Sequence, residues 1–180
     1  MGDLGAKIRE KRKEQNMSIK ELATRTGLTS GFISQVERNQ TEPSITSLRK
    51  VAQALDVAVF YFFIDEVNNN SVVRKSQRQK ITFPDSHLVY ELLSPDLNRQ
   101  MEMFFATLEP GAVTCDEPLS HNGEEVTLVL KGQMEIEIGI EKYLLGEGDS
   151  IYYFATSPHR IVNNGNVELE FISTITPPRF

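Results

Sequence analysis

The sequence contains a single cysteine, no tryptophan and no long apolar run. One cysteine excludes an internal disulfide and a zinc site built from several cysteines. No apolar stretch approaches the roughly 18 residues that a membrane-spanning helix requires. The first residues, MGDLGAKIREKRKEQN, have no apolar segment of the kind found in signal peptides. These absences predict a cytoplasmic protein with no membrane partner.

Charge is distributed unevenly within a formal net charge of −6. Residues 1–56 carry ten Lys/Arg and seven Asp/Glu, whereas residues 57–180 carry nine and eighteen. The first segment can therefore approach phosphate, and the second would be repelled by it. The hydrophobic period also changes, from helical spacing to strict alternation after about residue 81. We expect an α+β chain of two domains, with a helical domain over 1–66, a linker over 67–82 and a β domain over 83–180.

Residues 1–64 are predicted to form about five short helices. Ser18 followed by Glu21 is a capping box, which starts a helix at Ile19. Gly27 offers a backbone position open to positive φ and ends that helix. Thr29 can then cap a second short helix that runs to Arg38. Two short helices joined by a tight glycine turn indicate a helix-turn-helix.

The stretch SIKELATRTGLTSGFISQVERNQTEPSITSLRKVAQAL resembles the lambda-repressor-like, Xre-type helix-turn-helix family, and the resemblance covers residues 5–64. Thr26 departs from it, because an aliphatic residue is usual there. The resemblance implies that the second helix enters the major groove of double-stranded DNA. The implied base-facing residues are Thr29, Ser30, Gly31, Ser34 and Gln35. The residues expected on phosphate are Arg38, Lys20 and Arg49. The alternative is a helical module that binds another protein.

After residue 83 the sequence alternates apolar and polar residues in short runs. The strand candidates are HLVYELL, MEMFFATLE, EVTLVLKG, QMEIEIGI, EKYLLGEG, SIYYFA, HRIVNN and VELEFISTI. Gly, Pro, Asn and Asp separate most of them, which is typical of an antiparallel sandwich or barrel.

Two motifs in this region resemble the cupin family, whose fold is an all-β jelly roll, a double-stranded β-barrel. HNGEEVTLVLKG gives His121, three residues, Glu125, six residues and Gly132, which matches the end of the first cupin motif. Leu119 stands where that motif has its first histidine. GEGDSIYYFATSPHRIVN matches much of the second motif and contributes His159. The resemblance covers residues 85–177 and implies a jelly-roll barrel.

The resemblance implies a site at His121, Glu125 and His159. Two histidines and one carboxylate can form a facial triad with open positions, which suits ferrous iron or a similar divalent metal. His121 and Glu125 are four residues apart, so on a strand both would point into the barrel. Two alternatives stay open: the same residues form an effector pocket without metal, or the barrel only mediates dimerisation.

The whole chain resembles bacterial transcription regulators that join an Xre-type reader to a cupin sensor. The HNGEE segment, the Pro158-His159 pair and the TPPRF tail are similar to the putrescine-utilisation repressor branch. That branch implies repression and a small-molecule effector that is an amine or amino compound. One helix-turn-helix domain offers little contact area, so we expect a homodimer, or a dimer of dimers, on a palindromic site. We expect Glu124, Glu125 and Asp116 to pair with ammonium groups.

Two other functions are compatible with the same sequence features. A metal-dependent enzyme of the phosphonate-epoxidase type also combines a helix-turn-helix-like domain with a cupin and uses a two-histidine, one-glutamate iron site. A chromosome-tethered assembly protein without ligand is the third possibility. The intact recognition helix with basic surroundings favours the regulator, so we predict a protein that is not an enzyme.

Overall fold

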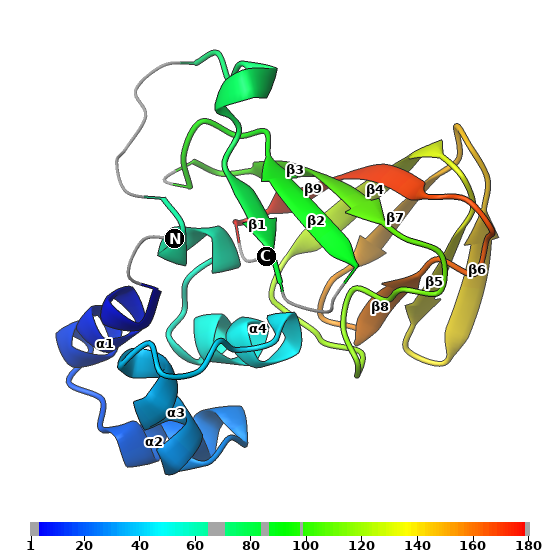
Figure 1. The fold of residues 1–180 in the computed structure, drawn as a ribbon. Helices are drawn as coiled ribbons and strands as arrows, with labels where there is room; N and C mark the ends of the chain where they lie inside the picture. The colour runs from blue at the N-terminus through cyan, green and yellow to red at the C-terminus, as the bar shows by residue number, and fades with distance from the viewer. Residues whose placement is uncertain (1–3, 65–70, 84–86, 98, 179–180) are drawn as a thin grey trace.

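The computed structural model describes residues 4–64, 71–83, 87–97 and 99–178, and shows helices followed by strands (Figure 1). The α-helices in this part of the chain are α1 (Leu4–Glu14), α2 (Ile19–Thr26), α3 (Ser30–Glu37) and α4 (Ile45–Ala54). The last of the roughly five expected elements, the run VFYFFI, which allows either a turn or a helix, forms a short 3-10 turn, η1 (Val59–Phe62). Its N-cap is Ala58, which offers no side-chain hydrogen bond to start an α-helix. Within the described residues, the helical domain therefore has four α-helices and this turn where about five helices were expected.

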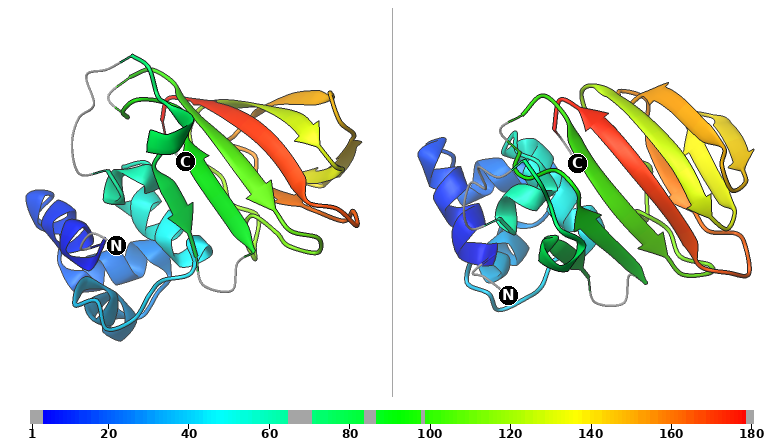
Figure 2. Two further views of the ribbon diagram at one scale, coloured as in Figure 1. Left: turned by 45° about the horizontal axis from the view of Figure 1, so that its top comes forward. Right: turned by 90° about the horizontal axis from the view of Figure 1, so that it is seen from above.

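The β domain consists of two antiparallel sheets that face each other (Figure 2). The larger sheet has the order β1-β2-β3-β9-β4-β7, and the smaller has the order β6-β5-β8. The strands are β1 (Lys80–Thr82), β2 (Leu88–Leu92), β3 (Glu102–Leu108), β4 (Glu124–Lys131), β5 (Met134–Ile138), β6 (Glu141–Leu145), β7 (Ser150–Phe154), β8 (His159–Val162) and β9 (Leu169–Thr176). All eight predicted strands are present as β2–β9, which confirms the two-sheet jelly roll.

Part of the expected linker is ordered as secondary structure. Residues 80–82 form strand β1, in which Ile81 is buried and pairs with Tyr90 of β2. A 3-10 turn, η2 (Lys75–Gln77), precedes it. Residues 65–70, where the sequence places the domain boundary and the start of the linker, lie outside the described residues. Lys80 and Thr82 are polar, so this three-residue strand shows too little alternation to be recognised from sequence.

The two domains pack against each other through one continuous apolar cluster. Phe63, just after η1, meets Phe83, just after β1, edge to face with ring centroids 6.4 Å apart. Helix α4 lies beside the barrel, close to the loop that leads into β4 (Figures 1 and 2). Within the described residues, no helix combines the length and apolar character needed to cross a membrane.

Candidate functional site

The helix-turn-helix is held by the caps that the sequence predicts. Ser18 Oγ accepts a hydrogen bond from the Glu21 amide at 3.1 Å, and the Glu21 carboxylate accepts one from the Ser18 amide at 2.7 Å. Gly27 has φ 68° and ends α2. Thr29 Oγ1 accepts from the Phe32 amide at 3.1 Å and starts α3. These contacts confirm the capping box, the glycine turn and the second cap.

Thr26, the departure from the family pattern, is buried at the end of α2. Its hydroxyl donates to the Leu22 carbonyl at 2.8 Å and accepts from the Leu28 amide at 3.3 Å. A buried hydroxyl with both roles satisfied costs little free energy. The threonine therefore replaces an aliphatic residue and also ties the turn to the helix.

The outer surface of α3 is formed by the residues expected to face bases. Thr29, Ser30, Gly31 and Gln35 are exposed, and Ser34 is half-buried. Lys20 and Arg38, two of the residues expected on phosphate, are exposed beside them. Arg38 Nε also donates to the Ser34 carbonyl at 3.0 Å. The helix-turn-helix domain thus presents small polar side chains at the centre of this surface and positively charged side chains at its edge.

Arg49 lies towards the barrel. It is half-buried on α4, between Thr46 and Gln53, both of which hydrogen-bond to the barrel. Burial lowers the pKa of His159, and the charge of Arg49 lowers it further. The guanidinium therefore acts on a group inside the β domain, which the sequence pattern did not indicate.

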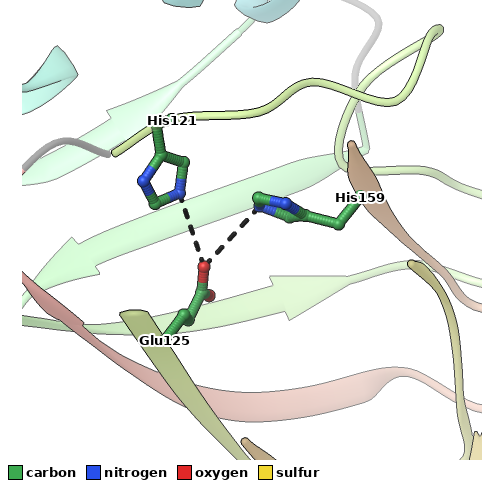
Figure 3. Close-up of side chains that lie close together, drawn as sticks. All are labelled: His121, Glu125 and His159. Carbon is green, nitrogen blue, oxygen red and sulfur yellow. Dashed lines mark ion pairs between the residues drawn. The ribbon is translucent and has the colours of Figure 1, made fainter. Parts of the chain in front are cut away.

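Inside the barrel, His121, Glu125 and His159 converge on one point (Figure 3). His121 comes from the loop before β4, Glu125 from β4 and His159 from β8. Glu125 Oε2 lies 3.6 Å from His121 Nε2 and 3.7 Å from His159 Nε2. All three side chains are at least nine-tenths buried. We call these three residues the barrel triad.

The ring orientations define which nitrogens carry protons. His121 Nδ1 lies 3.2 Å from the Asn122 carbonyl, and His159 Nδ1 lies 2.9 Å from the Ser157 carbonyl. A carbonyl oxygen only accepts, so each Nδ1 must be the donor. When the rings are neutral, each Nε2 atom therefore carries a lone pair and no proton. Neither Nε2 has a hydrogen-bond partner within the described part of the chain.

Charge in the triad is set by burial and by the three groups together. Burial lowers the pKa of His159 to about 4, so its ring is neutral at pH 7. Burial alone would raise the pKa of Glu125, but its contact with His121 and the other polar groups outweighs this and lowers it. At neutral pH the Glu125 carboxylate therefore faces the neutral ring of His159, and His121 Nε2 lies 3.6 Å from it.

Tyr153 is a fourth polar group at this site, and sequence reasoning missed it. It stands directly opposite Glu125 in the β4–β7 register, and its ring centroid is 5.0 Å from that of His159. Its buried hydroxyl has no hydrogen-bond partner among the described residues. Burial, together with the Glu125 carboxylate, holds the pKa of Tyr153 well above 10. The phenol stays protonated, and only its place opposite Glu125 in an antiparallel pair would have revealed it.

The other acidic residues expected in the pocket lie elsewhere. Asp116 accepts a hydrogen bond from Thr46 Oγ1 at 3.1 Å, at the junction of the domains. Glu124 accepts from the Tyr152 hydroxyl on the outer face of the sheet. Neither carboxylate is therefore part of the barrel triad: Glu124 precedes Glu125 on β4 and points to the opposite face of the sheet, and Asp116 lies in the segment before that strand.

The triad fits the donor set of a metal site. One ligand atom from each residue lies within 4.8 Å of the others. Two imidazole nitrogens and one carboxylate suit a divalent transition metal, with positions left for other ligands. The backbone of Leu119, where cupins carry a further histidine, pairs with His159 through bonds of 3.1 and 2.9 Å. Position 119 thus borders the triad but supplies an aliphatic side chain.

Two family models match the chain. Residues 8–62 match a helix-turn-helix model, and residues 104–175 match a cupin domain model. The HTH-type transcriptional regulator PuuR of Escherichia coli is 29% identical over 178 residues, which cover 98% of this chain and 96% of PuuR.

Solved structures share the fold. An HTH_3 family transcriptional regulator from Vibrio cholerae superposes with a TM-score of 0.79 at 22% identity, covering 97% of this chain and 94% of the other. Hydroxypropylphosphonic acid epoxidase from S. wedmorenis superposes with a TM-score of 0.51 at 18% identity, covering 96% of both chains. The epoxidase is a distant match that shares the fold alone.

Proposed function

We propose that this chain, which joins a helix-turn-helix domain to a C-terminal cupin domain, is a transcriptional regulator whose barrel binds a small cationic or amphoteric effector at the barrel triad. Binding of this effector changes the affinity of the chain for its operator. The observation that carries the proposal is the convergence of His121 Nε2 and His159 Nε2 on Glu125 Oε2, because neither nitrogen has a hydrogen-bond partner among the described residues.

A primary ammonium group matches this arrangement. It offers three N–H donors, one for each acceptor, and its charge offsets that of the Glu125 carboxylate. The protonated Tyr153 hydroxyl, beside Glu125, can donate to the carboxylate or accept from the guest. A buried polar atom without a hydrogen bond destabilises the protein. A ligand that forms hydrogen bonds to these atoms removes that unfavourable free energy, and this increases its affinity.

A divalent metal is the second class of guest that the same atoms favour. His121, Glu125 and His159 would hold it, and it would offer open positions to an organic ligand. A metal-dependent enzyme of the epoxidase type is the alternative function that this site supports. The named full-length relative is a transcriptional regulator, so we favour a regulator without catalytic activity.

For the helix-turn-helix domain, we propose that the start and outer surface of α3 face the bases, through Thr29, Ser30, Gly31, Ser34 and Gln35. Gln35 is exposed and can form two hydrogen bonds to adenine. Lys20 and Arg38 contact phosphate. Arg49 does not belong to this set, because it is half-buried on α4 between two residues that hydrogen-bond to the barrel. A protein that reads chromosomal DNA acts in the cytoplasm.

The outer face of the larger sheet suits a second copy of the chain. Met103, Thr174, Val126 and Tyr152 form one row across β3, β9, β4 and β7. Three of these four are apolar or aromatic side chains that are at least 39% exposed. Other large apolar residues exposed on the same face are Leu128, Leu130 and Phe154.

We propose that this face forms the homodimer. A contiguous exposed apolar patch of this kind is characteristic of an interaction surface. One short reading helix contacts few base pairs, and two readers related by a twofold axis can occupy two half-sites of a palindrome. The reading residues of α3 therefore require the homodimer in order to occupy a palindromic site.

Two measurements test the proposed function. A duplex selected from a random pool should bind with a log affinity that falls linearly with log salt, as phosphate contacts require. A thermal-shift screen of amines, amino acids and divalent metals should then find a compound that stabilises the protein, by about 2.7 kcal/mol at a hundredfold excess over its dissociation constant. Binding to no duplex at low salt would contradict the DNA-reading role. A screen without a single stabilising compound would contradict the effector role.

A further inference from the structure

A hollow of about 190 Å³ lies between the end of α4 and the rim of the barrel. The helical domain lines it with Gln53, Asp56 and Val57. The barrel lines it with Ser120, His121 and Asn122. The hollow therefore belongs to neither domain alone and is formed only where the two meet.

His121 is shared between the hollow and the barrel triad. His121 is one of the residues that line the hollow, and its Nε2 atom lies 3.6 Å from Glu125 Oε2 in the barrel triad. The side chain is 8% exposed, and Nε2 has no hydrogen-bond partner within the residues described. A ligand whose first group occupies the triad would pass this ring, and the rest of it would enter the hollow.

The hollow is rich in hydrogen-bond acceptors. Asp56 brings a carboxylate, and Gln53 brings an amide with both donor and acceptor atoms. Among the residues that the structure describes, neither Lys nor Arg lines the hollow. A group that carries N–H or O–H donors is favoured here, and a second carboxylate is disfavoured because it would meet Asp56.

One face of α4 holds the barrel rim beside the hollow. Thr46 and the Asp116 amide form a hydrogen bond of 3.2 Å, and Lys50 Nζ lies 3.7 Å from Glu117 Oε2. Gln53 Nε2 donates to the Ser120 carbonyl at 2.9 Å. Residues 46, 50 and 53 share one side of a helix, so these contacts follow the rim up to the residue before His121.

We propose that this hollow is the outer half of the effector site, so that the DNA-reading domain itself contacts the effector through Gln53 and Asp56. This inference rests on the proposed function, because it requires that the barrel triad binds the first group of the effector. An effector held by both domains binds tightly only when α4 is docked on the rim. By linkage, it stabilises the docked arrangement and so changes how the two readers of a dimer are placed on DNA.

The test uses the full-length chain and four probes that share a primary ammonium and a butyl chain: n-butylamine, 4-amino-1-butanol, 1,4-diaminobutane and 4-aminobutyrate. Calorimetric titration gives the affinity of each probe for wild type, Asp56→Asn and Gln53→Ala. Asparagine tolerates the positive φ of 54° at position 56, so Asp56→Asn should keep the backbone. The matched control is Glu147→Gln, which removes one negative charge from an exposed turn of the barrel.

We expect wild type to bind the probes that end in a hydroxyl or ammonium more tightly than n-butylamine, and 4-aminobutyrate least tightly. Asp56→Asn should weaken the hydroxyl or ammonium probe by about tenfold, the effect of one hydrogen bond to a charged group. The same variant should leave n-butylamine unchanged, and Glu147→Gln should change neither. Unchanged affinity in both Asp56→Asn and Gln53→Ala, with binding lost in Glu125→Gln, would overturn this inference and leave the proposed function standing. Failure of all four probes to bind wild type would count against both.

Discussion

The guanidinium of Arg12 in α1 forms a salt bridge with two hydrogen bonds to the carboxylate of Glu37 at the end of α3. Arg12 Nε donates to Glu37 Oε1 at 2.6 Å and a terminal nitrogen donates to Oε2 at 2.8 Å. A third bond of 2.7 Å runs from Arg12 to the Met17 carbonyl. Both side chains are less than 10% exposed. This pair fixes α3 to α1. The sequence does not indicate it, because Arg12 is one of several basic residues in succession.

Replacing Glu37 with alanine should destabilise the reader by about 3–5 kcal/mol, because it leaves the buried guanidinium of Arg12 without its anion. Urea unfolding followed by circular dichroism measures the change. The control is Glu14→Ala, since Glu14 forms an exposed pair with Lys11 at 3.2 Å and such pairs contribute less than about 1 kcal/mol. Equal effects of the two substitutions would show that the buried pair does not hold the domain.

The stability of the barrel should fall as the pH is lowered from about 6.5 to about 4. Burial lowers the pKa of His159 from 6.5 to about 4, so in this range the unfolded chain binds a proton that the folded chain does not. Lowering the pKa of His159 by this amount should reduce the free energy of unfolding by about 3 kcal/mol once the pH is below about 4. Urea unfolding at pH 7 and pH 5 gives the difference, and His159→Gln should remove most of it. His87→Gln, which changes an exposed histidine, should behave as wild type.

Base reading and phosphate binding should separate by mutation. Gln35→Ala and Ser34→Ala should weaken binding to the selected duplex more than binding to a scrambled duplex, by about 1–3 kcal/mol for a lost base contact. Lys20→Ala should weaken both duplexes alike and reduce the salt slope by about 0.9. Anisotropy titrations at several salt concentrations distinguish the two patterns. Equal losses on both duplexes for Gln35→Ala would argue that this residue does not read a base.

The outer face of the larger sheet predicts how the protein assembles. Leu128→Asp should dissociate the dimer, because it places a charge in the middle of the apolar face beside Ile172. Analytical ultracentrifugation gives the mass in solution. Leu144→Asp is the control, since Leu144 is as apolar and 63% exposed but lies on β6 of the smaller sheet. A dimer that survives Leu128→Asp would assign the interface to another surface.

Most of the fold could be predicted from the sequence, because helix caps and strand alternation depend on residues that are close together in the chain. Ser18, Gly27 and Thr29 act within a few residues of themselves, and the alternation in β2–β9 is visible along each strand. The three members of the barrel triad were found by motif spacing, and the structure brings them together.

The remaining features depend on contacts that are distant in sequence. Tyr153 belongs to the site only because β7 pairs with β4, and Arg49 acts on the barrel only because α4 docks there. Glu124 and Asp116 are acidic like Glu125, but Glu124 points to the outer face of the sheet and Asp116 lies at the junction of the domains. A charge count cannot distinguish them, since the face to which a side chain points depends on register.

Binding of a primary amine to wild type and to Glu125→Gln is the most direct test of the cationic effector site. Isothermal titration calorimetry, with the amine that raises the melting temperature most, gives both affinities. Because Glu125→Gln removes the only negative charge of the barrel triad, we predict a loss of about 2–5 kcal/mol, or at least about thirtyfold in affinity. Equal affinity of the two proteins would contradict the proposal that the barrel recognises a cation.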